Sequence, residues 1–199
     1  MTANNSMVTN NGLNCESVAA RECVADDVCD DGAWVSTSVE DTQRMAHLLA
    51  PLLVFGDCIE LTGDLGAGKT HFTQGLAVGL SIKDQVISPT FNLLLTYEGG
   101  RLPLFHFDLY RLDDELELED IGFYDACEDA GVVCIEWGEK FPAAMPEDRL
   151  VVRICAGDVC ADASLRMVQL EAYGSRAQAL RDAWEAALSL EFERRALHA

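Results

Sequence analysis

A continuous apolar run extends from Val132 to Ile135 and ends at the carboxylate of Glu136. A run without alternating polar residues is typical of a parallel strand that is buried on both faces. A second apolar run, Cys58 to Thr62, leads directly into a glycine-rich segment. We therefore expect a parallel sheet with Cys58–Thr62 as its central strand and with Glu136 at a carboxyl edge, where ligands of open α/β sheets collect.

An alternating pattern predicts a β-hairpin later in the chain, with arms at residues 92–97 and 102–108 and a turn at 98–101. Within the second arm, Leu104, His106 and Asp108 share one face, and Phe105 and Phe107 share the other. The segment before the hairpin, 87–91, contains Pro89 and is expected to be a loop. Further strands are predicted at 33–36, 150–156 and 165–172, the last two joined by a polar link.

Three segments show the apolar spacing of amphipathic helices. The first begins after Ser38, which with Asp41 can cap it, and ends before Pro51. The second runs from Lys69 to about Leu80, and its Gly75 and Gly79 suggest close packing of this helix against the sheet. The third runs from residue 175 to about 196. Shorter helical turns are predicted at 113–120, an acidic run expected to form a solvated face, and at 122–130.

Composition separates the first part of the chain from the rest. Residues 1–32 are Asn-rich and then acidic, with few large apolar side chains, so we expect a disordered extension; a regulatory or partner-binding tail is the alternative. Residues 33–199 are long enough for one buried α/β domain that ends in a helix. The chain of 199 residues carries 14 basic and 34 acidic residues, a net charge of −20 that disfavours extensive nucleic-acid binding.

The sequence has no apolar stretch long enough for a membrane span and no basic region followed by an apolar one at its start. Its eight cysteines form no C-x-x-C pair, and none stands beside a histidine at a zinc-ligand spacing. We expect a cytoplasmic protein with reduced thiols.

The strongest motif is Gly63-Asp64-Leu65-Gly66-Ala67-Gly68-Lys69-Thr70, which matches the phosphate-loop pattern G-x-x-x-x-G-K-S/T. The glycines let consecutive N–H groups curl around a phosphate, Lys69 reaches the outer phosphates, and the Thr70 hydroxyl can bind Mg²⁺. A strand precedes the motif and a helix follows it. The interpretation as a glycine-rich turn without a ligand is the alternative. Together with the strand pattern, the motif predicts a three-layer P-loop NTPase-like α/β fold, with a parallel core and an antiparallel hairpin in a mixed sheet.

A phosphate loop needs acidic partners to hold Mg²⁺ and to orient an attacking oxygen. Glu136 has the placement of a Walker B acid, unless it only caps a nearby loop. Asp108 closes the hairpin arm and could act in hydrolysis, or it could pair with Arg111. His106 is a candidate near them, with a purely structural imidazole as the alternative.

Absent motifs narrow the choice of function. The chain has no N-K-x-D or T-K-x-D for guanine and no L-S-G-G-Q, and it is too small for an AAA+ module. A P-loop small-molecule kinase usually closes an Arg-rich lid over the phosphates, but the corresponding segment here, 113–120, is acidic.

The phosphate loop, Ser88-Pro89-Thr90-Phe91, the segment from His106 to Arg111 and Ile135-Glu136-Trp137 occur in an order that resembles the TsaE (YjeE) family. That family comprises bacterial P-loop ATPases required for making threonylcarbamoyladenosine in tRNA. The resemblance covers about residues 34–156. The chain departs from it at His71, where a second Thr is frequent, in its N-terminal extension and in its long last helix.

The resemblance implies a role for each motif. ATP would lie on the loop from Asp64 to His71, with Lys69 at its phosphates and Thr70 and Glu136 at the Mg²⁺. Asp108 would orient water, with Thr90 near the γ-phosphate, and Trp137 would lie beside the nucleotide or at a partner surface. The implied partners are the TsaD and TsaB subunits that carry out the tRNA chemistry.

The sequence therefore predicts a slow ATPase that acts as a switch subunit in N6-threonylcarbamoylation of adenosine 37 in tRNA, with Asp108, Glu136 and Lys69 as catalytic residues. A stand-alone phosphotransferase acting on a small molecule is the alternative, and a nucleotide-binding scaffold without hydrolysis is a third hypothesis.

Overall fold

The strand predicted at the centre of the sheet is its central strand in the computed structural model, which describes residues 32–128, 131–156 and 165–197. This strand, β2 (Cys58–Thr62), is buried along its whole length. It pairs in parallel with β5 (Val132–Glu136) on one side and with β6 (Arg149–Ala156) on the other. The absence of alternation in both apolar runs thus reflects burial of the parallel core on two faces.

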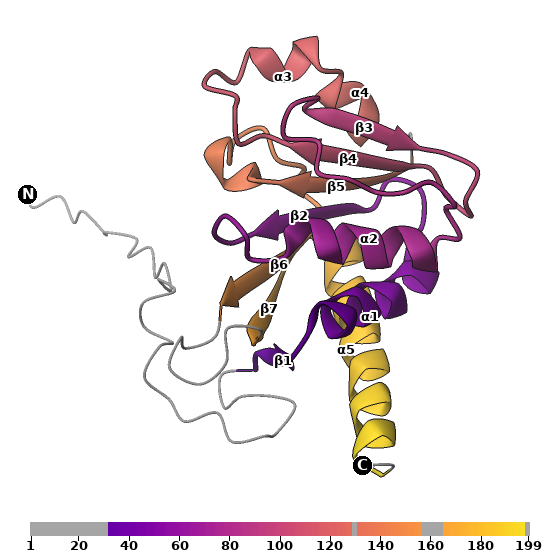
Figure 1. Ribbon diagram of the computed structural model, residues 1–199. Helices are drawn as coiled ribbons and strands as arrows, with labels where there is room; N and C mark the ends of the chain where they lie inside the picture. The colour runs from indigo at the N-terminus through magenta and orange to yellow at the C-terminus, as the bar shows by residue number, and fades with distance from the viewer. Residues whose placement is uncertain (1–31, 129–130, 157–164, 198–199) are drawn as a thin grey trace, which may run out of the picture.

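The rest of the sheet is mixed, as predicted. β4 (Leu104–Asp108) continues the parallel core beside β5, and β3 (Leu94–Tyr97) pairs antiparallel with β4 as the other arm of the hairpin. On the far side, β7 (Arg166–Tyr173) is antiparallel to β6, and β1 (Trp34–Ser36) is antiparallel to β7. The seven strands follow the order β1-β7-β6-β2-β5-β4-β3 (Figure 1).

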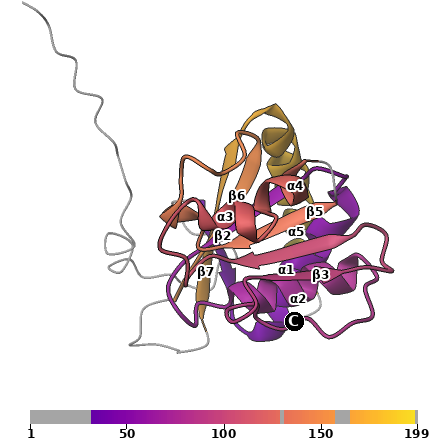
Figure 2. The same ribbon diagram turned by 90° about the horizontal axis from the view of Figure 1, so that it is seen from above.

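Helices cover the two faces of the sheet and complete the three layers. One apolar cluster joins α1 (Val39–Leu49), α2 (Lys69–Gly79) and α5 (Ser175–Ala196) to one face, and a second joins α3 (Glu117–Asp120) and α4 (Phe123–Cys127) to the other. Figure 2 shows α1 and α2 on the side of the hairpin strands opposite to α3 and α4. Strand β5 contributes side chains to both clusters: Val132 and Cys134 belong to the first, and Val133 and Ile135 belong to the second.

Local sequence signals account for the limits of α1. The Ser38 hydroxyl accepts a hydrogen bond from the Asp41 amide at 3.1 Å, as the predicted cap requires. The helix ends at Leu49, and a 3₁₀ turn, η2 (Ala50–Leu52), carries Pro51. Proline has no amide hydrogen to continue the α-helical ladder, so the chain leaves the helix there.

The glycines of α2 face a helix and not the sheet, which corrects the sequence-based expectation. A Cβ atom at Gly75 would lie 2.0 Å from the Gln43 carbonyl oxygen, and one at Gly79 would lie 2.4 Å from the Ala50 side chain. Both partners belong to the α1–η2 segment. Spacing along α2 could indicate a close approach, but only the tertiary arrangement decides which element makes it.

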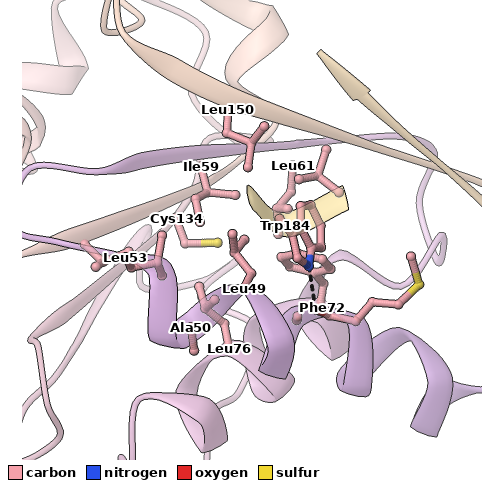
Figure 3. Close-up of a cluster of buried hydrophobic side chains, with 14 of the residues drawn as sticks. Leu49, Ala50, Leu53, Ile59, Leu61, Phe72, Leu76, Cys134, Leu150 and Trp184 are labelled. Atoms are coloured by element: carbon pink, nitrogen blue, oxygen red, sulfur yellow. Dashed lines mark hydrogen bonds between the residues drawn. The ribbon is translucent and has the colours of Figure 1, made fainter. Parts of the chain in front are cut away.

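The last helix is part of the core that supports the phosphate loop. Trp184 of α5 is fully buried, its ring meets that of Phe72 of α2 edge-on at 5.8 Å, and its indole N–H donates to the Met45 carbonyl of α1 at 3.0 Å. Figure 3 shows Trp184 among the side chains of this cluster, including Leu61 of β2. The amphipathic pattern predicted for 175–196 is therefore confirmed, with Leu180, Trp184, Leu188 and Phe192 buried.

Several boundaries and one thiol differ from expectation. The first hairpin arm begins at Leu94, because Leu93 has a positive φ of 64°. The acidic run contains only the single turn α3, whose Leu118 is buried while the charged residues around it are exposed, and α4 ends at Cys127. Cys155 is disulfide-bonded, so the expectation of reduced thiols is wrong for this residue, whereas Cys58, Cys127 and Cys134 are free.

The proposed extension at residues 1–32 lies outside the described residues except for Gly32, and the division into an extension and one domain stays a prediction. None of the described helices is both long and apolar enough to cross a bilayer. The cytoplasmic location likewise stays a prediction.

Candidate nucleotide-binding site

The phosphate-loop motif connects β2 to α2 at the carboxyl edge of the parallel strands (Figure 1). Gly63, Gly66 and Gly68 have φ values of 131°, 81° and 114°, in the region that glycine adopts without steric cost. Gly63 is constrained twice, since a Cβ atom there would lie 2.0 Å from the Ile154 carbonyl oxygen of β6. The glycines of the motif are thus required by backbone geometry.

The inner part of the loop offers a cradle for an anion. Added Cβ atoms at Gly66 and Gly68 would meet no atom within 4 Å, so both residues border open space. Gly68 is also the N-cap of α2, and no side chain caps this helix end. Unpaired amides at the positive end of a helix dipole suit a phosphate group.

Lys69 is buried at the base of this cradle, with 5% of its surface exposed. Its Nζ donates hydrogen bonds to the carbonyls of Gly63 at 2.7 Å and Asp64 at 3.0 Å, and it lies 4.1 Å from the centre of the Trp137 ring. Burial lowers the pKa of the ammonium below its ordinary value, although Glu136 and other nearby carboxylates oppose this shift. A phosphate bound here would provide a negative charge next to the partly desolvated ammonium of Lys69.

Thr70 and Glu136 meet across the site. The Thr70 hydroxyl donates to Glu136 Oε1 at 2.9 Å, and His106 Nε2 lies at the same distance from this oxygen. Both Glu136 and His106 are buried, at 4% and 0% exposure. The interpretation of Glu136 as a carboxylate that only caps a loop is therefore not needed, because its partners are a phosphate-loop hydroxyl and a buried imidazole.

The donor set suits Mg²⁺ rather than a metal that prefers nitrogen and sulfur ligands. Hydroxyl and carboxylate oxygens are hard ligands, and Mg²⁺ usually takes only one or two protein ligands besides phosphates and water. No group of three or more His, Cys, Asp or Glu side chains able to hold a metal occurs in the described part of the chain. Thr70 and Glu136 are thus the residues that could hold the ion.

Asp108 is held by the loop that precedes the hairpin. Its Oδ2 accepts a short hydrogen bond from the Thr90 hydroxyl, its Oδ1 accepts from the Tyr110 amide at 3.0 Å, and Ser88 is hydrogen-bonded to Thr90 at 2.7 Å. Asp108 is 2% exposed and lies opposite Glu136 in the register of β4 and β5. The structure therefore brings Thr90, Asp108 and Glu136 to the same sheet edge.

The alternative of an ion pair between Asp108 and Arg111 does not hold among the described residues. The guanidinium of Arg111 instead lies over the ring of Phe91, 4.3 Å from its centre. Phe91 is itself 83% exposed. Within the described ranges, the donors to Asp108 are the neutral Thr90 hydroxyl and Tyr110 amide, and its carboxylate has further acceptor capacity for a water molecule.

Trp137 lies between the phosphate-loop lysine and the outer surface. It adopts a left-handed backbone conformation with a φ of 66°, and its ring is 5.1 Å from that of Tyr110. Leu65 and His71, also predicted at the nucleotide, have exposed side chains. Leu65 can offer a phosphate only its backbone amide because its side chain is apolar, whereas His71 also carries an imidazole donor.

Two sizeable hollows lie away from this edge. One of about 230 Å³ is lined by Asp57, Arg149, Arg176 and their neighbours, at the amino ends of β2 and β6, and one of about 290 Å³ lies beside Gln43 and Gln74. Their polar side chains are largely engaged with one another; Arg176, for example, binds Asp57 at 2.6 Å. The site is accordingly recognised by its chemistry and not by cavity size.

Sequence reasoning missed two residues at the site. Thr73, one turn into α2, has its hydroxyl 3.5 Å from His106 Nε2. Arg166, at the start of β7, donates from Nε to the Ala67 carbonyl of the phosphate loop at 2.9 Å. Helical spacing from Lys69 could have indicated Thr73, but nothing in the local sequence points from Arg166 to a loop so far away in the chain.

Comparison with known proteins agrees with this geometry. The sequence model of the family described as "Threonylcarbamoyl adenosine biosynthesis protein TsaE" matches residues 36–162. The chain is 43% identical over 126 residues to the tRNA threonylcarbamoyladenosine biosynthesis protein TsaE of Bacillus subtilis, covering 63% of this chain and 78% of the relative. It is 42% identical over 120 residues to the corresponding protein of Treponema pallidum, covering 60% and 88%.

A solved structure supports the fold independently. The crystal structure of YdiB from Bacillus subtilis superposes with a TM-score of 0.66 at 32% identity, covering 77% of this chain and 93% of that one. The three-layer α/β fold, the phosphate loop and the match over residues 36–162 together show that the chain belongs to the TsaE family of tRNA threonylcarbamoyladenosine biosynthesis proteins.

Proposed function

We propose that this protein binds ATP with Mg²⁺ and hydrolyses it slowly, as a switch subunit required for N6-threonylcarbamoylation of adenosine 37 in tRNA. The observation that carries the proposal is the contact between the Thr70 hydroxyl and Glu136 Oε1 at 2.9 Å, beside the buried Lys69. It joins the start of α2 to the end of a parallel strand, which is the arrangement that places a metal ion next to nucleotide phosphates in P-loop enzymes.

Lys69 would serve the outer phosphates. At present its Nζ is held by the carbonyls of Gly63 and Asp64. An ammonium has three donors on a flexible stem, so it can turn toward phosphate oxygens while keeping part of this contact. The negative charge of the phosphates would favour its protonated form.

Thr70 and Glu136 would hold Mg²⁺, which when bound supplies charge neutralisation of the phosphates. His106 keeps Glu136 Oε1 directed toward Thr70, since both donors meet the same oxygen. The carboxylate is thereby oriented before any ligand arrives, which reduces the reorganisation needed on binding.

Asp108 would orient the attacking water, and Thr90 would lie near the γ-phosphate. The bond between the Thr90 hydroxyl and Asp108 ties the 88–91 loop to the end of β4. A ligand group that competes for the Thr90 hydroxyl would therefore change the position of this loop. Such a loop offers a partner a surface that differs between the ATP and ADP states.

The partners in this proposal are TsaD-like and TsaB-like subunits of the threonylcarbamoyl transferase. The exposed Phe91 lies on the same loop as Thr90, where a partner could sense its position. The net charge of −20 suits a protein that acts through another protein and not through extensive contact with tRNA.

The test is ATP hydrolysis by the full chain, alone and with a purified TsaB–TsaD pair, for the wild type, Glu136→Ala and the exposed-site control Glu119→Gln. We expect low basal turnover that changes when the pair is added, disappears in Glu136→Ala and persists in the control. Turnover that is indifferent to the pair and to Glu136 would contradict the proposal. Phosphorylation of an added metabolite would instead support the alternative of a small-molecule kinase.

A further inference from the structure

Arg166 reaches the phosphate loop from a strand outside the segment that the family's sequence model matches. Arg166 is the first residue of β7 and follows the matched segment 36–162 in the chain. It pairs in register with Ser36 of β1 and with Ala156 of β6. From there its Nε donates to the Ala67 carbonyl at 2.9 Å, and its Nη1 donates to the Leu165 carbonyl at 2.9 Å. The side chain is half-buried, so this contact is made at the edge of the core.

The contact fixes the direction of a peptide group in the anion cradle. No peptide bond in the described chain is cis. In a planar trans peptide the carbonyl and the following N–H point in opposite directions. A hydrogen bond that draws the Ala67 carbonyl toward β7 therefore directs the Gly68 N–H away from β7, and Gly68 borders the open space at the start of α2.

The other hydrogen bonds of the loop do not orient the Ala67 carbonyl. The Ala67 amide bonds within the loop to the Asp64 carbonyl at 3.1 Å. Lys69 bonds to the carbonyls of Gly63 and Asp64, but its ammonium must also serve the phosphates. Among the described residues, Arg166 is the side chain outside the motif that donates a hydrogen bond to the loop backbone from 63 to 68.

We infer that Arg166 is a positioning residue for nucleotide binding, which holds the Ala67–Gly68 peptide so that the Gly68 N–H is presented to a phosphate. The inference rests on the proposed nucleotide binding. It assigns the role to the hydrogen bond from Nε and not to the positive charge of the guanidinium.

Two substitutions separate these roles. Glutamine has its amide nitrogen the same number of bonds from Cα as the arginine Nε, so Arg166→Gln keeps a donor and removes the charge. Lysine has a methylene group at that place and carries its donors one bond further out, so Arg166→Lys keeps the charge and removes the donor from the position that Nε holds. Arg44→Gln is the matched control, because Arg44 pairs with Glu191 on the surface of α1 and α5.

The measurement is the Kd of the full-length protein for Mg-ADP by calorimetry, with the unfolding midpoint of each ligand-free variant recorded by circular dichroism. We expect Arg166→Lys to raise Kd about tenfold, as loss of one hydrogen bond of ordinary strength does. Arg166→Gln is expected to stay within about threefold of wild type, and Arg44→Gln to match it. The Gly68 amide resonance of the ligand-free protein should move in Arg166→Lys and less in Arg166→Gln.

Each other outcome has a defined meaning. If Arg166→Gln bound Mg-ADP more weakly while Arg166→Lys kept the wild-type Kd, the effect would belong to the charge and the inference would be overturned. A wild-type Kd in both variants would also overturn it. A loss of affinity that follows a lowered unfolding midpoint, with an unmoved Gly68 resonance, would reduce Arg166 to a structural residue. Failure of the wild type itself to bind Mg-ADP would reject the proposed function, and the inference with it.

Discussion

His106 Nε2 lies 2.9 Å from Glu136 Oε1, and both side chains are buried between the phosphate loop and the sheet. An ionised carboxylate only accepts hydrogen bonds, so the Nε2 of His106 is the donor. The other ring nitrogen, Nδ1, is buried without a partner among the described residues. The polar contacts of the imidazole are thus both at Nε2, to Glu136 Oε1 at 2.9 Å and to the Thr73 hydroxyl at 3.5 Å, and the shorter one orients the carboxylate proposed to hold Mg²⁺.

Replacing His106 should impair the metal site more than nucleotide binding. His106→Leu removes the donor to Glu136, and we expect hydrolysis to fall about tenfold or more, with a higher Mg²⁺ concentration needed for half-maximal rate. His106→Gln, which keeps a donor at similar reach, should retain more activity. The check is the rate of ATP hydrolysis across a Mg²⁺ titration; identical titration curves for His106→Leu and wild type would contradict the positioning role.

Asp108→Asn should slow hydrolysis without weakening nucleotide binding. The substitution preserves shape and the contact with the Tyr110 amide, but it removes the charge that would orient and polarise a water molecule. A fall of about 10²–10⁴-fold in kcat is expected for loss of a group that acts on the attacking water. Single-turnover hydrolysis and Mg-ADP affinity should be measured together, with Asp113→Asn of the exposed acidic run as the control.

If Asp108→Asn hydrolysed ATP at the wild-type rate, Asp108 would have no role at the attacking water. The third hypothesis, a nucleotide-binding scaffold without hydrolysis, would be supported if tRNA threonylcarbamoylation stayed intact in a variant that has lost hydrolysis. Loss of both binding and hydrolysis would instead indicate that the bond from Thr90 to Asp108 shapes the site as a whole.

Because Lys69 is buried, we expect the free energy of unfolding to vary with pH in the alkaline range. Burial sets the pKa of its ammonium below the value of 10.5 expected in the unfolded chain. Between these two pKa values the unfolded state binds more protons than the folded state, so Lys69 favours folding increasingly as pH rises through this window. Below the folded-state pKa the contribution is constant.

The measurement is the free energy of unfolding from neutral pH to pH 10.5 for the wild type, Lys69→Met and the exposed control Lys83→Met. The difference between the wild type and Lys69→Met should shift in favour of the wild type toward the alkaline end, and the Lys83→Met difference should not. Saturating Mg-ATP, which supplies counter-charge, should flatten the trend. A difference that does not vary with pH would mean that the ammonium is as well solvated in the folded protein as in the unfolded chain.

Trp184 should be essential to stability although it lies beyond the segment matched by the family. Trp184→Ala removes a fully buried ring, its contact with Phe72 and the hydrogen bond to Met45. A loss of about 3–5 kcal/mol in the free energy of unfolding is expected. Leu190→Ala, on the exposed side of the same helix, should change it by less than about 0.5 kcal/mol. Denaturant titration provides the comparison, and similar effects of both variants would show that α5 is only loosely attached.

The elements whose signals are local could be predicted from the amino-acid sequence. The phosphate-loop motif, the serine cap before α1, the unalternating runs of β2 and β5 and the amphipathic pattern of α5 depend on backbone sterics, capping and burial, which act over a few residues. The same signals placed Lys69, Thr70 and Glu136 together, because the ends of parallel strands meet at one edge of a sheet.

The groups that complete the site are brought there by contacts between distant parts of the chain. His106 contacts Glu136 through strand register, and Gly75 faces Gln43 because α1 packs across α2. Arg166 reaches Ala67 from a strand 99 positions further along the chain. Such contacts arise from the summed packing of the whole core, and no short segment of sequence specifies that sum. The local pattern could therefore predict which residues carry the phosphate chemistry, but not which distant side chains orient them.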